Sequence, residues 1–122
     1  MSRFLRNTAQ LEALGDGHFR VSGVLDASTV TSILDQSQSA FAGGPQLLFD
    51  LTAVKEGDSS GLALLLEWLR LARKAGQKIH FQEVPEQIMA LARISEVDDL
   101  LLENGVEASA ETLESQPTAV SA

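Results

Sequence analysis

Apolar and polar residues alternate in two short stretches near the start of the chain. Positions 10–14 and 18–25 show this alternation, and a Gly-Asp-Gly segment at 15–17 lies between them. Phe19 and Val21 fall on the same face of the second stretch. A period of two is typical of half-buried strands, and a glycine-rich turn between two such runs is typical of a hairpin. The pattern therefore predicts two antiparallel strands.

The spacing changes to a helical one over residues 26–42. Apolar side chains recur there every three or four residues, and Gly43-Gly44-Pro45 follows at once. Asp26 or Ser28 supplies a preferred N-cap, and the Gly-Gly-Pro run stops a helix. We therefore expect one helix from Asp26 to Ala42.

Two later stretches read as strands. The apolar run Gln46–Leu51 predicts a buried central strand, with Asp50 near its end and a loop over 52–57. Residues 78–84 alternate again, with Ile79 and Phe81 expected to face inward. Helices are expected over 59–75, 86–94 and 97–102. The order β-β-α-β-α-β-α-α predicts an α/β fold with a mixed sheet of about four strands and helices packed against it.

The length of 122 residues fits one domain, which we expect to span residues 1–104. Residues 105–122 contain three glutamates and neither lysine nor arginine, so we expect a solvated acidic tail there. The net charge of −8 argues against a nucleic-acid partner, which would require clustered basic side chains. The absence of cysteine excludes disulfides, thiolate metal sites and a cysteine nucleophile.

No segment predicts direct insertion into a membrane. The longest apolar run, Leu62–Leu66, is far shorter than a bilayer span, and the first residues lack the apolar core of a signal peptide. We therefore expect a cytoplasmic protein, which would associate with a membrane only through a partner.

The segment 59–75 carries more apolar surface than an ordinary surface helix. Its apolar arc covers about 220°, against roughly 100° for a helix with one buried face. One stripe is expected to face the sheet: Leu62, Leu65, Leu66, Leu69 and Ala72. A second stripe consists of Leu64, Trp68, Leu71 and Ala75. Either neighbouring helices cover the second stripe, or Leu64, Trp68 and Leu71 form a surface that binds a partner.

The tetrapeptide Asp58-Ser59-Ser60-Gly61 opens this helix. Asp and Ser are preferred N-caps, so capping alone explains their presence. A hydroxyl at this place also lies at the positive end of the helix dipole, where a phosphate would be favoured electrostatically. Ser59 and Ser60 are therefore candidate regulatory residues as well as capping residues.

No arrangement of residues predicts catalysis, a metal site or a cofactor. His18 and His80 fall in separate predicted strands and belong to no recognisable motif. Asp50 and Asp58 flank one predicted loop, where capping and turn formation explain them better than acid–base chemistry. We therefore expect a non-catalytic protein with no cofactor, although nucleotide binding at Ser59 or Ser60 stays an alternative.

The residues of the central strand, loop and helix resemble the STAS domain family, which includes the anti-sigma factor antagonists. The resemblance covers about residues 10–104 and depends on the run Leu47–Thr52 followed by Asp58-Ser59-Ser60-Gly61-Leu62. Within this family, the sequence is most similar to the branch that supplies a small subunit to the Mla phospholipid ABC transporter of Gram-negative bacteria. Lys55-Glu56-Gly57 departs from this pattern, since that loop is usually more apolar in the family.

The resemblance implies two different functions for the serines. In the transporter branch the first hydroxyl, matching Ser59, is implicated in function, and the partner is the cytoplasmic ATPase of the transporter. Such a subunit supports the assembly or activity of a complex that maintains outer-membrane lipid asymmetry. In the sigma-antagonist branch the second hydroxyl, matching Ser60, is phosphorylated by an anti-sigma factor kinase. We expect the transporter function and keep the phosphorylation switch as the alternative.

Overall fold

The computed structural model describes residues 7–104 as a four-stranded mixed sheet with helices packed against it. The strands are β1 (Ala9–Gly15), β2 (His18–Leu25), β3 (Gln46–Gly57) and β4 (Lys78–Gln82), and they lie in that spatial order. The β1–β2 pair is antiparallel, whereas β2–β3 and β3–β4 are parallel. The predicted α/β fold and the predicted hairpin are confirmed. The expected acidic tail lies outside the described residues.

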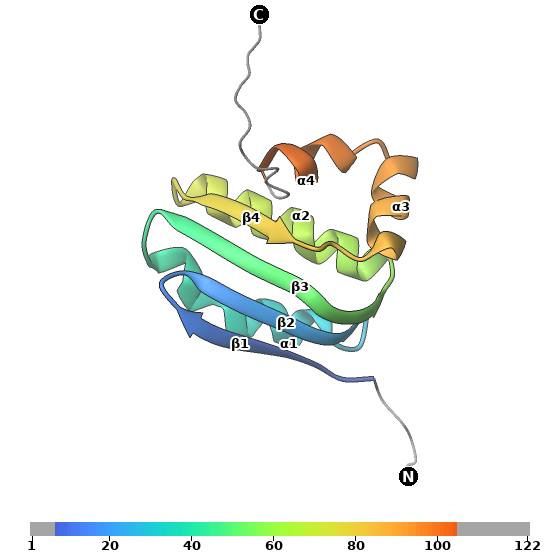
Figure 1. Ribbon diagram of the computed structural model, residues 1–122, viewed down its shortest axis with the longest axis horizontal. Coiled ribbons are helices and arrows are strands. Elements are labelled where there is room, and N and C mark those ends of the chain that lie inside the picture. The colour runs from blue at the N-terminus through green and yellow to red at the C-terminus, as the bar shows by residue number, and fades with distance from the viewer. Residues whose placement is uncertain (1–6, 105–122) are drawn as a thin grey trace, which may run out of the picture.

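The helices lie mainly on one face of this sheet. They are α1 (Val30–Ser37), the 3₁₀ segment η1 (Gln38–Ala42), α2 (Ser59–Lys74), α3 (Glu86–Ile94) and α4 (Asp98–Asn104). In Figure 1, α1 lies behind β1 and β2, α2 lies behind β3 and β4, and α3 and α4 lie beyond the β4 edge. The opposite face of the sheet carries no helix of the described chain.

Strand β3 is twice as long as the sequence pattern suggested. We expected a strand over Gln46–Leu51 and then a loop, but pairing with β2 continues to Gly57. The register between the two strands shifts twice, because β3 advances one residue more than β2 at each irregularity. Buried residues therefore recur at Leu51, Val54 and Gly57, every third position. Since bulges interrupt the period of two, an alternation rule ends this strand too early.

The first helix begins later than predicted. Residues 26–29 form a turn in which Thr29 N–H and Val30 N–H both donate to the carbonyl of Asp26. The Asp26 carboxylate accepts from the amide and the hydroxyl of Ser28, at 2.9 and 2.7 Å. Asp26 therefore stabilises a turn before the helix. The expectation that Asp26 or Ser28 is the N-cap was wrong, because Thr29 occupies that position. The last five residues of the predicted range belong to η1, not to α1.

The other predicted boundaries differ by a few residues. Strand β4 ends at Gln82, two residues before the predicted end, because Glu83 adopts a left-handed φ of 60°. The last helix is shifted towards the C-terminus and runs over Asp98–Asn104. The predicted inward orientation of Ile79 and Phe81 is confirmed, since their exposed fractions are 3% and 1%.

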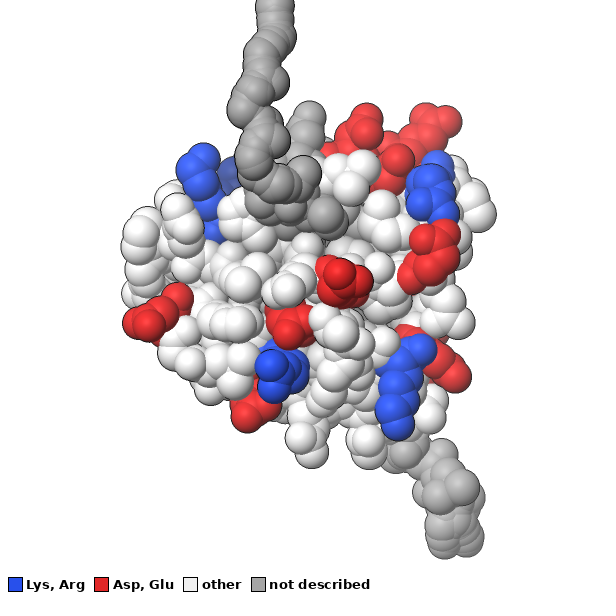
Figure 2. All heavy atoms as spheres, in the orientation of Figure 1, with Lys and Arg blue, Asp and Glu red and all other residues white. Residues whose placement is uncertain are grey.

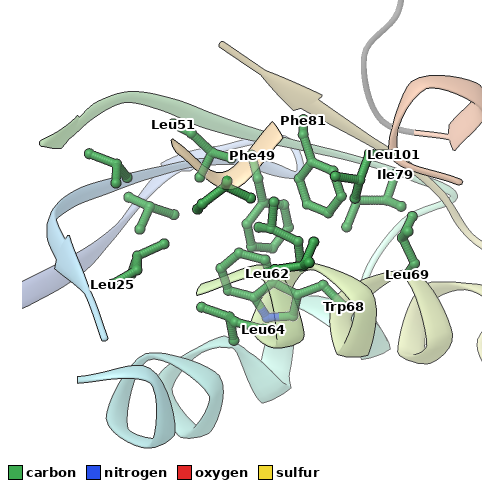
Figure 3. Close-up of a cluster of buried hydrophobic side chains, with 14 of the residues drawn as sticks. Leu25, Phe49, Leu51, Leu62, Leu64, Trp68, Leu69, Ile79, Phe81 and Leu101 are labelled. Carbon is green, nitrogen blue, oxygen red and sulfur yellow. The ribbon is translucent and has the colours of Figure 1, made fainter. Parts of the chain in front are cut away.

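Aromatic side chains fill the centre of the core between the sheet and α2. Phe49 of β3 lies 4.3 Å from Trp68 of α2, measured between ring centroids, and Phe81 of β4 lies 6.3 Å from both rings. Figure 3 shows these rings pointing from the sheet and from the helix into one cluster. Trp68 Nε1 donates to the buried Ser37 hydroxyl of α1 at 2.8 Å, and this bond joins the two helices. The core therefore includes a polar anchor for its largest side chain.

The buried residues of the two apolar stripes of α2 form one continuous face. At about 100° per residue, the buried positions from Leu64 round to Leu62 cover an arc of about 160°. Leu62 lies at one edge of this arc. A helical wheel that takes Leu62 as its reference therefore splits one buried face into two apparent stripes. The chain itself covers this arc with β3, β4, α1, α3 and α4. The intramolecular explanation, left open by the sequence, is the one that the structure supports.

Candidate functional site

The tetrapeptide 58–61 lies at the junction between β3 and α2, at one end of the molecule. Asp58 is the N-cap of α2, and its carboxylate accepts from the Ser60 amide at 2.8 Å. Ser59, the first helical residue, is exposed, Ser60 is half-buried and Gly61 is buried. The predicted capping role of Asp58 is confirmed. The two serines therefore differ in access, and Ser59 is the more open of the two.

Two glycines allow α3 to pack closely against this junction. A Cβ atom at Gly57 would lie 2.5 Å from Ile88 Cδ1, and one at Gly61 would lie 3.0 Å from the same atom. The Gly57 amide also donates to Gln87 Oε1 at 3.0 Å. Gly61 thus has a steric role in the motif, and Gly57 and Gln87 are site residues that the sequence analysis missed. The glycine before the motif was visible in the sequence, but the contact with α3 was not.

Two shallow hollows border the junction. One, of about 290 Å³, lies between α1 and α2, and Ser60 is part of its wall. Its other lining residues are mostly apolar or small: Val30, Thr31, Leu34, Ala63, Leu64 and Glu67. The second, of about 170 Å³, is bordered by Asp58 and is polar. Its other lining residues are Val24, Leu25, Asp26, Glu56, Gly57 and Gln87. The motif therefore separates an apolar hollow from an acidic one.

The predicted partner-binding residues on α2 need correction. Leu64 is 3% exposed and Trp68 is fully buried, so the interpretation of Trp68 as an exposed anchor was wrong. Both side chains contribute to the core that the chain forms by itself, and Leu64 only reaches the floor of the apolar hollow. Leu71 is half-buried and packs against the edge of the same core. The surface next to the serines is therefore defined by the hollows and not by a free apolar stripe.

Hydrogen bonds favour the charged form of one carboxylate in the acidic hollow, that of Asp26. The Ser28 hydroxyl and then the Asn7 amide lower the pKa of Asp26 below its usual range. Hydrogen bonds to the charged form of a carboxyl group favour ionisation. Asp26 is therefore an anion at neutral pH, held in a fixed orientation beside the motif.

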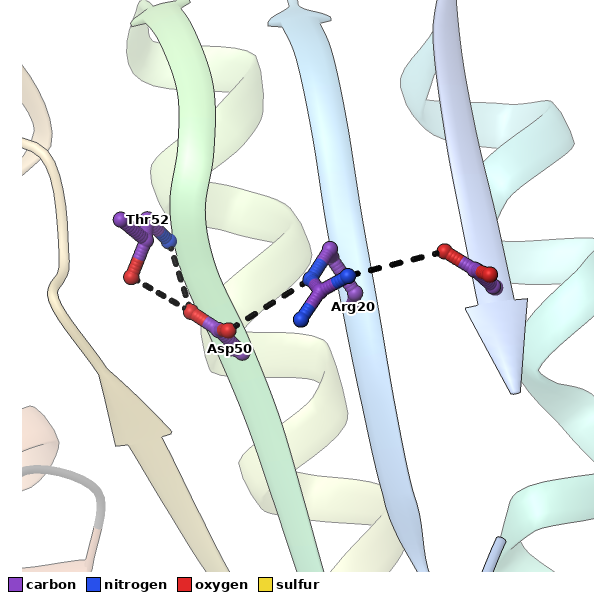
Figure 4. Close-up of polar contacts among 4 residues, drawn as sticks. Arg20, Asp50 and Thr52 are labelled. Carbon is purple, nitrogen blue, oxygen red and sulfur yellow. Dashed lines mark hydrogen bonds and ion pairs between the residues drawn. The ribbon is translucent and has the colours of Figure 1, made fainter. Parts of the chain in front are cut away.

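A separate polar network lies on the helix-free face of the sheet. Asp50 accepts from the hydroxyl and the amide of Thr52 at 2.6 and 2.9 Å, and Arg20 Nε lies 3.6 Å from its other oxygen. Figure 4 shows this chain of contacts running across β3 and β2 towards β1, where Glu12 meets Arg20 at 4.0 Å. The Thr52 hydroxyl, more than Arg20, lowers the pKa of Asp50. Asp50 lies within β3, so the prediction that it flanks one loop with Asp58 was wrong.

The described residues offer no grouping for metal binding. His18 lies in β2 and His80 in β4, with Leu48 of β3 paired between them. Within residues 7–104, no cluster of three or more His, Cys, Asp or Glu side chains could hold a metal ion. Each histidine is a strand residue, as the sequence indicated.

Charges of both signs are spread over the helix-free face. Figure 2 shows blue and red side chains scattered among uncharged ones, without a continuous basic tract on the part of this face that is described. Among the described helices, none is both long enough and apolar enough to cross a membrane.

The arrangement of strands and helices is that of a STAS domain. The solved structure of the anti-sigma factor antagonist SpoIIAA in its unphosphorylated form matches with a TM-score of 0.62. This match covers 84% of the chain and 89% of SpoIIAA, at 17% sequence identity, and so it shows the fold alone.

Sequence comparison gives the family within this fold class. The family described as "Mlab, STAS domain" matches residues 9–103, and the chain belongs to this family. The intermembrane phospholipid transport system binding protein MlaB of Escherichia coli K12 is 32% identical over 74 residues. The protein of the same description from Shigella flexneri is equally similar, and each match covers 61% of this chain and 74% of the relative. The resemblance seen in the sequence is confirmed.

Proposed function

We propose that this chain is a non-catalytic accessory subunit of an Mla-type phospholipid ABC transporter. It binds the cytoplasmic ATPase subunit through the end of the molecule that carries Asp58-Ser59-Ser60-Gly61, and so supports the assembly or activity of the transporter. The single observation that carries the proposal is the family match over residues 9–103, which includes the whole motif.

The geometry of the motif supports docking in preference to chemistry. Ser59 is exposed at a helix N-terminus. The Asp58 carboxylate accepts a hydrogen bond from the Ser60 amide, and none of its described hydrogen bonds involves a histidine or a lysine. A hydroxyl needs a nearby base to act as a nucleophile. The junction is also well fixed by α3 through Gly57 and Gln87. A rigid and accessible surface of this kind binds a partner with little ordering cost.

The direct test is binding to the phospholipid-transporter ATPase of the same organism. We expect the purified chain to bind the purified ATPase subunit in isothermal titration calorimetry, and Ser59→Arg to weaken the affinity at least about tenfold. Ser39→Arg is the matched control, because Ser39 is also exposed but lies in η1, where the chain leads away from the motif end. Absence of binding by the unmodified chain would refute the proposal. Equal weakening by both variants would refute the assigned surface.

A second candidate follows from the position of Ser60. Its half-buried hydroxyl borders the apolar hollow, so a phosphate there would place about two negative charges beside apolar surface. In this alternative the chain is an anti-sigma factor antagonist, and a kinase modifies Ser60. Incubation with the cognate kinase and ATP should then add one phosphate, and Ser60→Ala should abolish the labelling. Labelling that persists in this variant would exclude it.

A further inference from the structure

We infer that the two hollows beside the motif bind a single basic and apolar element of the partner: an apolar side chain enters the hollow between α1 and α2, and a lysine or arginine side chain enters the acidic hollow. This inference rests on the proposed function and specifies the chemistry of the partner surface.

The hollow between α1 and α2 favours an apolar side chain. Its wall includes Val30, Leu34 and Ala63, and Leu64 closes its floor. The only charged lining residue is Glu67, whose carboxylate already accepts two hydrogen bonds from the Arg70 guanidinium, at 3.0 and 2.6 Å. Apolar surface removed from water on docking contributes roughly 25 cal/mol per Å². The favourable occupant is therefore a nonpolar group, with the Ser60 hydroxyl at the rim.

The second hollow favours a cation. Three carboxylates line it, those of Asp26, Glu56 and Asp58, and its lining contains no basic side chain. Asp26 and Asp58 are oriented by hydrogen bonds from Ser28 and from the Ser60 amide, whereas the carboxylate of the exposed Glu56 forms no hydrogen bond or ion pair with another residue of the described range 7–104. Gln87 adds a neutral polar wall. A lysine or arginine of the partner would complement this charge and speed up association.

Charge also decides between the possible occupants. The segment 105–122 of this chain has three glutamates and no basic residue, so it would be repelled from the acidic hollow. A second copy of the chain also carries a net charge of −8. A separate partner with a basic docking element has the complementary charge. Because Asp58 and Ser60 belong to different hollows but lie two residues apart, one short element can reach both.

The test uses single substitutions that leave the caps and the core intact. Ala63→Gln adds a neutral side chain at an exposed position beside the apolar hollow. Its matched control is Lys74→Gln, on the same exposed side of α2 but about 16 Å further along the helix. Glu56→Gln removes one carboxylate from the acidic hollow, and Asp99→Asn on α4 removes one elsewhere. Each variant is titrated with the purified ATPase subunit at low and at moderate salt.

We expect Ala63→Gln to weaken binding about tenfold and Glu56→Gln about threefold. The affinity of Glu56→Gln should also depend less on salt than the affinity of the unmodified chain. Both controls should bind like the unmodified chain. If the unmodified chain does not bind the ATPase at all, the proposed function itself fails. If it binds and the hollow variants bind as tightly as their controls, only the inference about the two hollows is overturned.

Discussion

The hydrogen bond between Trp68 and Ser37 gives the sharpest test of the core. Trp68 is the only tryptophan of the chain, and its Nε1 donates to Ser37 Oγ at 2.8 Å. The Ser37 hydroxyl in turn donates to the Leu34 carbonyl at 2.7 Å. Both side chains are fully buried. Replacement of Ser37 by alanine therefore leaves a buried donor without its acceptor.

The expected cost follows from the chemistry of the indole. An indole N–H can only donate, and a buried unsatisfied donor costs about 1–3 kcal/mol. At about 2 kcal/mol, Ser37→Ala should lower the urea midpoint by roughly 1 M for a domain with an unfolding slope near 2 kcal/mol/M. This is a large share of the stability of a small domain, which is about 5–15 kcal/mol.

A double-mutant cycle isolates the bond from other effects. Urea unfolding is followed by circular dichroism for the unmodified chain, Ser37→Ala, Trp68→Phe and the double variant. Because phenylalanine has no N–H, Ser37→Ala should cost at least about 1 kcal/mol less in the Trp68→Phe background. The exposed Ser39→Ala serves as the control, with an effect within about 0.5 kcal/mol. Equal costs of Ser37→Ala in both backgrounds would refute the assignment of this bond as an anchor of the core.

Three further predictions concern the sheet, the motif and a helix end. Asp50→Asn should lower the free energy of unfolding more at pH 7 than near pH 2.5, because the stability linked to the lowered pKa of Asp50 is fully present above the usual carboxyl pKa and declines as the pH falls; urea titrations at both pH values check this, and an equal effect at both would contradict it. Gly57→Ala should destabilise the fold by roughly 1–3 kcal/mol, because the added methyl group would clash with Ile88. In thermal unfolding, the double variant Gly57→Ala with Ile88→Val should recover part of this lost stability, and no recovery would show that the strain lies elsewhere. Glu96→Gly should raise the free energy of unfolding by up to about 1 kcal/mol, because Glu96 has a φ of 61° where the equivalent residue after α2 is Gly76; a decrease would contradict this account of the α3 end.

The parts of the fold that follow from local chemistry were predictable. The hairpin, the start of α2 at Asp58 and the helix after Pro85 each depend on turn or cap residues close in sequence. The bulges of β3 depend on pairing with β2, about 30 residues away, and they allow the strand to continue through Lys55 and Glu56. A rule based on the alternation of apolar and polar residues cannot detect such a shift of register.

The candidate site was predictable in its centre but not in its surroundings. The motif residues and their place at a helix N-terminus followed from the sequence. The burial of Trp68 depends on a hydroxyl 31 positions earlier, and the fit of Gly57 depends on Ile88 of α3. The acidic hollow likewise brings Asp26 next to Asp58 from separate elements. These contacts arise only when the helices pack on the sheet, so the sequence pattern placed the exposed surface on the wrong side of α2.

Hydrogen–deuterium exchange on the complex with the phospholipid-transporter ATPase tests the central claim most directly. We expect amides of residues 57–64, together with those around Gln87, to exchange more slowly once the ATPase is added. Amides of residues 43–46 and 75–78, which lie where β3 and β4 begin, should exchange at unchanged rates. Protection confined to those starting segments, or a stable complex that leaves residues 57–64 unprotected, would contradict docking through the motif.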